Sequence, residues 1–345
     1  MRPPNGPTRT RFFALLAVAF TVSLAACGSS ASEGDGASAT TTTATSASTS
    51  STTAAATATS TWPTTDLVLD PSKDYGDLYA DGILPVGDGK VVLDEPEVGQ
   101  VYLCHDGGDA SVGGAQERGP WFINDNTEYD INQKIYVEGS VTWDGEYDLT
   151  VEGGERVIET NAVPDDHTTG EFPVASDDPA YQYDRNPNAI SEQELEYRVT
   201  AEPELLDEPA CMGGEVGVMV NGVPLFNALD AGNRDAGAWE TQDDCDGHPQ
   251  VTGEYHYHTL SACIDDVSTS TVIGWALDGF PITGPTVSDG NILTTVDLDE
   301  CHGITSEVEI DGEMVEMYHY VMTQDFPYSV SCFRAEAAAA PNFGG

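Results

Sequence analysis

Residues 253–258 read Gly-Glu-Tyr-His-Tyr-His, and the interpretation of the chain starts from this segment. Side chains in an extended strand alternate between its two faces, so His256 and His258 share one face while Tyr255 and Tyr257 share the other. Two imidazoles roughly 7 Å apart on one face of a strand can converge on one metal ion. The chain has only seven histidines, so this predicted strand is the first candidate for a functional site.

The amino terminus has the pattern of an export signal. Arginines precede an apolar run from Phe12 to Ala26, which is too short to cross a bilayer comfortably, and Cys27 follows directly. Residues 24–28, Leu-Ala-Ala-Cys-Gly, look like the bacterial lipobox, in which the cysteine is lipidated and begins the mature chain. We therefore expect a signal peptide at 1–26 and acyl chains such as palmitate on Cys27. These would anchor an exported protein to the outer face of the cytoplasmic membrane.

Composition divides the rest of the chain into three parts. Residues 27–65 consist of the cysteine and a segment rich in Ser, Thr and Ala, which predicts a flexible tether. Residues 66–334 are numerous enough to bury a substantial core and are expected to form the folded domain. The Ala-rich residues 335–345 are expected to form a flexible tail.

The chain is strongly acidic. It has 59 acidic residues against 12 Lys and Arg, a net charge of −47 that becomes −50 when the three leader arginines are removed. Such a field repels nucleic acid, so no nucleic-acid partner is expected. The acidity fits either solubility in a salty exterior or the binding of cations such as calcium, although the sequence contains no EF-hand loop.

Short runs rich in Val, Ile, Tyr and Thr, separated by Gly-containing turns, predict a mainly β fold. Alternation at 134–138 and 141–143 indicates a sheet with one solvent-exposed face. Later strands are expected at 196–201, 216–226, 254–260, 272–277 and 308–322. Little helix is expected beyond a capped turn at Ser191–Leu195. The predicted fold is a sandwich-like arrangement of antiparallel sheets with long loops, stapled by disulfides.

Two parts of the chain repeat the same order of residues. Residues 243–263 and 299–332 each contain an acidic pair, a Cys, a Gly, a Tyr-His-Tyr strand and a second Cys. Six cysteines follow Cys27, and an even number in an exported domain predicts three disulfides, with fifteen possible connectivities. If each repeat is closed by its own disulfide, the pairs are Cys245–Cys263 and Cys301–Cys332. That leaves Cys104 to pair with Cys211.

Eight motifs follow one another between Gly119 and Phe333. They are Gly-Pro-Trp at 119–121, the segment 179–188, Val-Asn-Gly-Val-Pro-Leu-Phe-Asn-Ala at 220–228, Asp-Gly-His-Pro at 246–249, Tyr-His-Tyr-His at 255–258, Ala-Leu-Asp-Gly-Phe-Pro-Ile at 276–282, Leu-Asp-Glu-Cys at 298–301 and Asp-Phe-Pro-Tyr at 325–328. In this ordered set the chain resembles the YHYH-domain family of secreted and lipid-anchored proteins. The second repeat departs from the motif, because Val321 stands where a second His would complete it. The resemblance implies a domain type without a defined biochemical activity.

The functional interpretation is a single asymmetric metal site centred on His256 and His258. Imidazole suits zinc or copper, and cysteines held in disulfides leave no thiolates to compete. The candidate ligands are His248, His256, His258, His302, His319 and Asp278, with His319 reaching across from the second repeat. Two alternatives stay open: a buried network of hydrogen-bonded His and Tyr that specifies the core, and a pocket for a small ligand or glycan.

Motifs of familiar catalytic and nucleotide sites do not occur in the sequence, so no nucleotide cofactor is expected. A non-enzymatic metal-binding protein and a metal-dependent hydrolase both remain, and an open coordination position would indicate the hydrolase. A third interpretation is recognition of glycan or peptide by Trp121, Trp143, Trp239 and Trp275. Arg185 is expected either to clamp a structural carboxylate or to bind a ligand, and His105 and His167 are expected at the surface.

Overall fold

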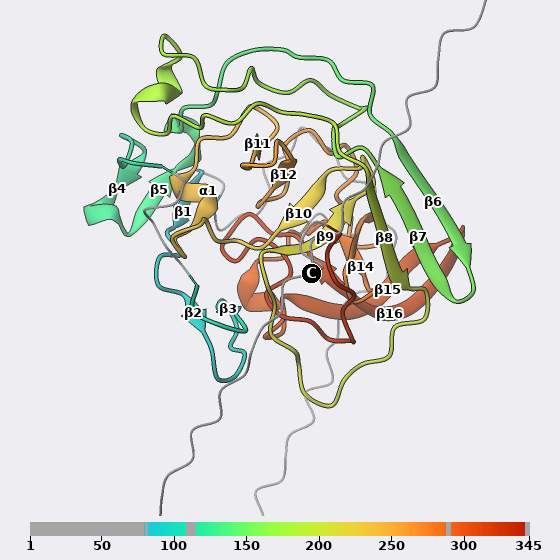
Figure 1. Ribbon diagram of the computed structural model, residues 1–345. Helices are drawn as coiled ribbons and strands as arrows, with labels where there is room; N and C mark the ends of the chain where they lie inside the picture. Colours follow the sequence, from blue (N-terminus) through green and yellow to red (C-terminus); the bar gives the residue numbers. More distant parts are fainter. Residues whose placement is uncertain (1–78, 80–81, 108–114, 288–290, 342–345) are drawn as a thin grey trace, which may run out of the picture. The chain divides into compact units, whose positions relative to one another are not determined.

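The computed structural model describes residues 79, 82–107, 115–287 and 291–341 (Figure 1). The expected signal peptide, the lipidated Cys27 and the tether lie outside these residues. Within the described part, no helix has both the length and the apolar character needed to cross a membrane.

The described chain is mainly β, as predicted, and its strands are short. The strands are β1 (Ile83–Pro85), β2 (Val91–Val92), β3 (Val101–Tyr102), β4 (Phe122–Ile123), β5 (Glu128–Asp130), β6 (Tyr147–Glu152), β7 (Glu155–Thr160), β8 (Leu195–Thr200), β9 (Glu215–Met219), β10 (Pro224–Phe226), β11 (Gly247–Pro249), β12 (Tyr255–Tyr257), β13 (Val272–Ala276), β14 (Pro281–Thr283), β15 (Gly303–Ile310) and β16 (Glu313–Val321). One α-helix, α1 (Ala236–Trp239), and the 3₁₀ turns η2 (Asn124–Asn126), η3 (Ile131–Gln133), η4 (Pro179–Gln182) and η5 (Thr295–Asp297) complete the elements in the described residues.

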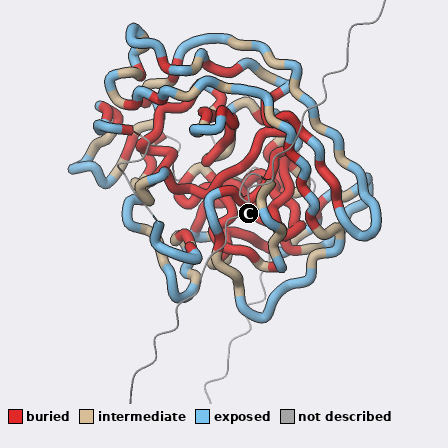
Figure 2. Tube along the Cα trace, in the orientation of Figure 1, coloured by how far each residue is buried: buried red, intermediate tan, exposed pale blue. Residues whose placement is uncertain are grey.

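Eight strands form the central sheet, in the order β11-β12-β10-β9-β13-β14-β16-β15. Three smaller sheets have the orders β1-β5-β4, β2-β3 and β6-β7-β8. Most neighbours are antiparallel, which agrees with the predicted fold class, but β10–β12, β14–β16 and β2–β3 are parallel. Buried segments gather over the central strands, whereas the tip of the β6–β7 hairpin is exposed (Figure 2).

The central sheet consists of two copies of one four-strand unit. The first copy is β9–β12 and the second is β13–β16, and the strand order of the second mirrors that of the first. Val218 pairs with Trp275 where the copies meet. In the first copy Leu225 of β10 pairs with Tyr257 of β12, and in the second Ile282 of β14 pairs with Tyr320 of β16. The sequence repeat is therefore also a structural repeat, because equivalent residues pair with each other in the two copies.

An acidic loop begins the second hairpin of each copy. The carboxylate of Asp243 accepts hydrogen bonds from the backbone N–H of Cys245 and Gly247 and from the Tyr255 hydroxyl. These bonds fix the turn that leads into β11 and tie it to β12. The same three bonds recur in the second copy, where Asp299 accepts from Cys301, Gly303 and Tyr318.

The turn between the first two strands of each copy contains a glycine at an equivalent position. Gly222 and Gly279 have φ of +84° and +87°, in the left-handed region that favours glycine. A Cβ on Gly222 would collide with the side chain of Thr160, and one on Gly279 would collide with the backbone of Thr200. The ends of β7 and β8 therefore pack against the turns of both copies.

The three disulfides are Cys104–Cys211, Cys245–Cys263 and Cys301–Cys332, in the pairing expected from the repeat. Two other expectations are wrong. Ser191–Leu195 is not helical: it is extended and leads into β8, because the Ser191 N–H pairs with the Gly253 carbonyl. The start of the Ala-rich tail is packed rather than free, since the Ala335 N–H donates to Asp278 and the Ala338 N–H to the Leu277 carbonyl.

Candidate metal centre

Three histidines meet at the β11–β12 end of the central sheet. His248 on β11 pairs directly with His256 on β12, and His258 follows β12 on the same face as His256. Their ring centroids are 4.5 to 5.4 Å apart, and each offers one nitrogen within 4.8 Å of the others. All three side chains are buried. The alternation in the sequence therefore predicted the shared face of His256 and His258 correctly.

Backbone carbonyls fix the orientation of two of the rings. His256 Nδ1 lies 3.2 Å from the Glu254 carbonyl oxygen, and His258 Nδ1 lies 2.5 Å from that of Asn227. A carbonyl oxygen can only accept, so both Nδ1 atoms carry hydrogen and donate. Both Nε2 atoms of these neutral rings are therefore acceptors, and they face each other at 3.2 Å. Two facing lone pairs at this distance require a proton or a cation between them.

Glu240 completes the cluster from the end of α1. Its backbone N–H closes the helix by donating to the Ala236 carbonyl. Its Oε2 lies 3.0 Å from His248 Nε2 and 3.4 Å from His258 Nε2. The sequence analysis missed Glu240, because one acid among 59 carries no signal of its own.

A buried lysine holds the segment that carries Glu240. Lys134 Nζ donates to the carbonyl oxygen of Gly237 and to Oε1 of Gln242, at 2.6 Å in each case. These two residues lie on either side of Glu240 in the chain. Lys134 therefore fixes the position of a carboxylate that it does not touch.

The electrostatics of the cluster keep two of its histidines neutral. Burial lowers the pKa of His256 well below its usual value and the pKa of His258 to about 4. Burial also opposes charge on His248, but the Glu240 carboxylate outweighs it and raises the pKa of His248. Burial raises the pKa of Glu240, yet His248 and His258 more than offset this and lower it to about 2. At neutral pH the cluster thus presents a carboxylate and two unprotonated imidazoles.

The separations between these atoms fit a tetrahedral metal ion. Bonds of about 2.0–2.1 Å to nitrogen or oxygen give a tetrahedron with edges of about 3.3–3.4 Å. The three separations given above between the Nε2 atoms of His248, His256 and His258 and Oε2 of Glu240 are 3.0, 3.2 and 3.4 Å. These three of the six edges agree with such an ion. Phe226 packs against the His256 ring at 4.2 Å between centroids and closes one side.

His319 does not reach across to this site, contrary to the prediction. Four strands separate β12 from β16, which places the two strands about 24 Å apart along the sheet. His319 Nδ1 lies 2.9 Å from the Thr283 hydroxyl and Nε2 lies 2.7 Å from that of Ser306. Both ring nitrogens are used inside the second copy, where burial lowers the pKa of His319 to about 3.

His302 and Asp278 are also outside the cluster, so their prediction as ligands is corrected. His302 Nε2 bonds to the Thr323 hydroxyl at 2.9 Å. Asp278 accepts from the Tyr320 hydroxyl and from the backbone N–H of Arg334 and Ala335. Both side chains are buried structural groups of the second copy: His302 joins the start and the end of its last hairpin, and Asp278 joins the β13–β14 turn to β16 and to the C-terminal segment.

The second copy has apolar side chains at two of the three positions of the histidine cluster. Ile304 pairs with His319 as His248 pairs with His256, and Val321 stands at the position of His258. Ile304 and Val321 pack in an apolar cluster with Val287, Leu293 and Leu298. The asymmetry expected from Val321 therefore extends to a second ligand position.

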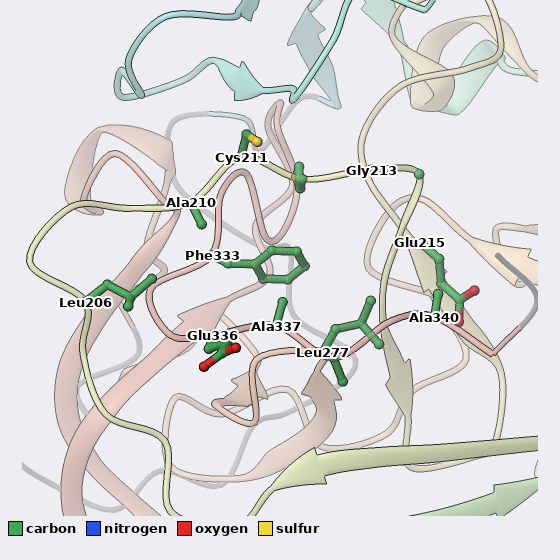
Figure 3. A pocket seen from close by; sticks show the side chains of 13 residues that line it. Leu206, Ala210, Cys211, Gly213, Glu215, Leu277, Phe333, Glu336, Ala337 and Ala340 are labelled. Carbon is green, nitrogen blue, oxygen red and sulfur yellow. The ribbon is translucent and has the colours of Figure 1, made fainter. Parts of the chain in front are cut away.

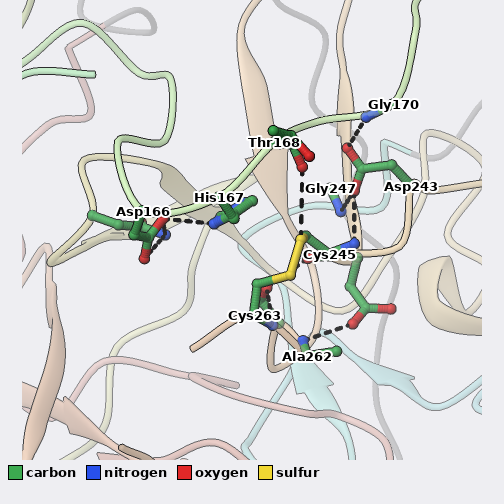
Figure 4. Close-up of a disulfide and its surroundings, with 12 residues drawn as sticks. Asp166, His167, Thr168, Gly170, Asp243, Cys245, Gly247, Ala262 and Cys263 are labelled. Atoms are coloured by element: carbon green, nitrogen blue, oxygen red, sulfur yellow. Dashed lines mark hydrogen bonds and ion pairs between the residues drawn. A yellow bond between two sulfur atoms is a disulfide. The ribbon is translucent and has the colours of Figure 1, made fainter. Parts of the chain in front are cut away.

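His167 is not a surface residue, contrary to expectation. Its side chain is 8% exposed, Nδ1 lies 2.6 Å from Asp166 Oδ1, and Nε2 lies 3.1 Å from the Tyr257 hydroxyl. A ring nitrogen also lies within 4.8 Å of the sulfurs of Cys245 and Cys263 (Figure 4). The sulfurs are bonded to each other, so they supply no thiolate and this group is not a metal site.

The remaining candidates lie apart from the cluster. Arg185 is exposed and stacks over Tyr181 with its guanidinium 5.5 Å from the ring centroid, and His105 is exposed as expected. Trp121, Trp239 and Trp275 are buried, whereas Trp143 is half-buried. Three of the four tryptophans are thus core residues and do not line an exposed groove.

Fold and site together define a disulfide-bonded, mainly β protein with a buried cluster of three histidines and a glutamate. The family model for YHYH proteins matches residues 196–292, which include all four cluster residues. Residues 196–292 are therefore a YHYH domain, as the resemblance predicted. Searches of curated proteins and of solved structures returned no match.

Proposed function

We propose that this protein is a non-enzymatic metal-binding protein that holds one transition-metal ion through His248, His256, His258 and Glu240. The observation that carries the proposal is the pair of unprotonated Nε2 atoms of His256 and His258, which face each other at 3.2 Å beside a buried carboxylate. A bound cation removes the repulsion between these lone pairs and neutralises the carboxylate. Backbone carbonyls already orient the two rings for that role.

Zinc is the metal that the geometry favours. Zinc binds imidazole and carboxylate in tetrahedral sites, whereas Cu(II) prefers tetragonal arrangements. The three separations of 3.0 to 3.4 Å between donor atoms are compatible with tetrahedral edges. Calcium is disfavoured at this site, because it takes six to eight oxygen ligands.

A role in binding rather than hydrolysis follows from the fourth ligand. A catalytic zinc keeps one position open for water, whereas a structural or storage site is closed by protein ligands. Glu240 supplies a fourth donor atom and is itself buried with the three histidines. The proposed ion is therefore enclosed by protein on all four sides.

We further propose that the protein is exported and anchored by lipid on Cys27. The lipobox-like sequence and the Ser/Thr-rich segment after it support this placement. Three disulfides in the domain also favour an oxidising compartment outside the cytoplasm. A Cys27→Ser variant is expected to lose incorporation of radiolabelled palmitate and to leave the membrane fraction. A wild-type protein that incorporates no label would contradict the anchor.

Calorimetric titration of the chelator-treated domain with zinc and with copper tests the metal site. We expect one zinc ion per chain, and no saturable binding in the His256→Ala, His258→Ala double variant. The matched control is His302→Ala, His319→Ala, which removes two buried histidines of the second copy and should leave the stoichiometry at one. Loss of binding in the control with retention in the first variant would contradict the assignment.

A further inference from the structure

A cavity of about 170 Å³ lies where α1 meets the segments that follow β12 and β16, and none of the four metal-cluster residues lines it. Hydroxyl, amide and charged side chains are all present in its wall. The wider cavity beside the start of β9 is different (Figure 3): of the described residues that line it, only Glu215 and Glu336 have polar side chains. The smaller cavity therefore offers the greater variety of hydrogen-bonding groups.

Three polar atoms in the wall of the smaller cavity have no hydrogen-bond partner among the described residues. They are the hydroxyl oxygens of Tyr136 and Thr259 and Oδ1 of Asp246. The other carboxylate oxygen of Asp246 accepts from the Ala262 N–H at 3.0 Å. All three side chains are half-buried, and none of the three atoms is shut off from solvent. They are therefore accessible to a ligand that enters the cavity.

Much of the remaining wall is apolar. Leu84 and Leu260 contribute aliphatic surface. Tyr129 and Tyr328 contribute their rings, because their hydroxyls are already bonded: they lie 3.0 Å from each other, and that of Tyr328 donates to Asp235 at 2.6 Å. The cavity thus combines apolar surface with a few hydrogen-bonding groups, as small-molecule sites do.

The charges in the wall favour a neutral ligand. Lys134 and Asp246 are the charged side chains among the described residues that line the cavity, and each stabilises the charged form of the other. Burial raises the pKa of Asp246 to about 6, so its carboxylate is ionised at pH 7.5. One positive and one negative group balance locally, and the net charge of −47 on the whole chain repels anions.

We propose that this cavity binds one neutral pyranose ring, whose hydroxyl groups bond to Asp246, Tyr136 and Thr259. A cavity of about 150 Å³ holds benzene, so 170 Å³ is enough for one six-membered ring. The hydroxyls of a sugar donate to the carboxylate and exchange bonds with the two protein hydroxyls. Its apolar C–H face packs against the rings of Tyr129 and Tyr328.

Saturation-transfer NMR titrations with matched sugars test the proposal. The neutral probes are methyl β-glucoside, methyl β-galactoside and methyl α-mannoside, and the charged probes are the three corresponding uronates. The protein is used as purified, at pH 7.5. We expect saturable binding of at least one neutral glycoside and at least tenfold weaker binding of its uronate. Absence of saturable binding for all three neutral glycosides, or equal affinity for a glycoside and its uronate, would overturn the proposal.

Asp246→Asn tests the carboxylate. It removes the charge but keeps an acceptor for the Ala262 N–H, and Asn tolerates the φ of +63° at this position. The variant should bind the neutral glycoside at least tenfold more weakly, because hydrogen bonds to a charged group are the stronger ones. The matched control is Asp244→Asn, an exposed neighbour that does not line the cavity, and its affinity should equal that of the wild type. Equal affinities in the two variants would contradict the assignment.

Ala262→Phe tests the location. Ala262 is exposed and lines the cavity, so a larger side chain there fills the space from the surface. The variant is first matched to the wild type by circular dichroism and thermal midpoint, and it should lose glycoside binding. Binding that survives in the folded variant would place the sugar elsewhere and overturn the proposal.

Discussion

His258 and Val321 occupy equivalent positions in the two copies of the four-strand unit. Each follows a Tyr-His-Tyr sequence whose last tyrosine pairs with the first hairpin of its copy. His258 contributes to a buried polar cluster, whereas Val321 contributes to an apolar one. The same arrangement of strands thus encloses a polar cluster in one copy and an apolar cluster in the other.

This difference predicts that two matched truncations lower stability in different ways: one independently of zinc, the other chiefly when zinc is present. Val321→Ala should cost about 2–3 kcal/mol of unfolding free energy, with or without zinc, because it removes buried methyl groups. His258→Ala should cost stability chiefly in the presence of zinc, because it removes a ligand. Chemical denaturation of both variants with zinc and with chelator measures this. A zinc-dependent cost in Val321→Ala would contradict the assignment.

Glu240→Gln tests the fourth ligand. The substitution keeps the size of the side chain but removes the charge, so zinc affinity should fall by about 100-fold. Asp278→Asn is the control, because Asp278 is a buried acid of the second copy and an amide oxygen can still accept the bonds made to its Oδ2. Competition with a zinc-binding dye measures both constants. An equal loss in the two variants would show that Glu240 acts only through general electrostatics.

The disulfide Cys245–Cys263 should matter for the metal more than its counterpart does. All three histidines of the cluster lie between these two cysteines, whereas no cluster residue lies between Cys301 and Cys332. Replacing either pair with serine should cost about 3 kcal/mol of unfolding free energy. Only removal of Cys245–Cys263 should also lower zinc affinity, by about tenfold or more, because the ligands lose their preorganisation. Equal zinc affinity in the two double variants would contradict this.

Glu215 should make stability fall as pH rises. Burial raises its pKa to about 8 in the folded state, from 4.5 for the exposed group. Below pH 4.5 the carboxyl is protonated in both states, and between pH 4.5 and 8 only the unfolded state ionises, so folding loses free energy. The stability of Glu215→Gln relative to the wild type should therefore rise by about 1 kcal/mol per pH unit between pH 5 and 8. Unfolding in urea at pH 5, 6.5 and 8 measures this, and a constant difference would contradict it.

The sequence predicted those features that depend on neighbouring residues. Alternation placed His256 and His258 on one face, and the repeated order of acid, Cys and Tyr-His-Tyr predicted the disulfide pairs. The strand predicted at 308–322 is in fact part of a hairpin, in which Asp311-Gly312 joins β15 to β16. Both turn residues have positive φ. An Asp-Gly pair between β-forming runs is typical of such a turn.

The rest depends on tertiary contacts that the sequence does not display. Lys134 comes from a distant loop, and Glu240 lies at the end of α1, outside the strand alternation that relates the histidines. His319 shares the Tyr-His-Tyr pattern of His256, and similarity of pattern alone predicted it as a ligand. The order of strands in the central sheet, which places the two motifs at opposite ends, decides otherwise.

Zinc-edge X-ray absorption of the zinc-loaded domain tests the metal site most directly. The expected spectrum has four nitrogen or oxygen neighbours at about 2.0–2.1 Å, with multiple scattering from three imidazoles. In His258→Ala the imidazole count should fall to two, and in His319→Ala it should remain three. A spectrum with six oxygen neighbours, or with no more than one imidazole, would contradict a site built from His248, His256, His258 and Glu240.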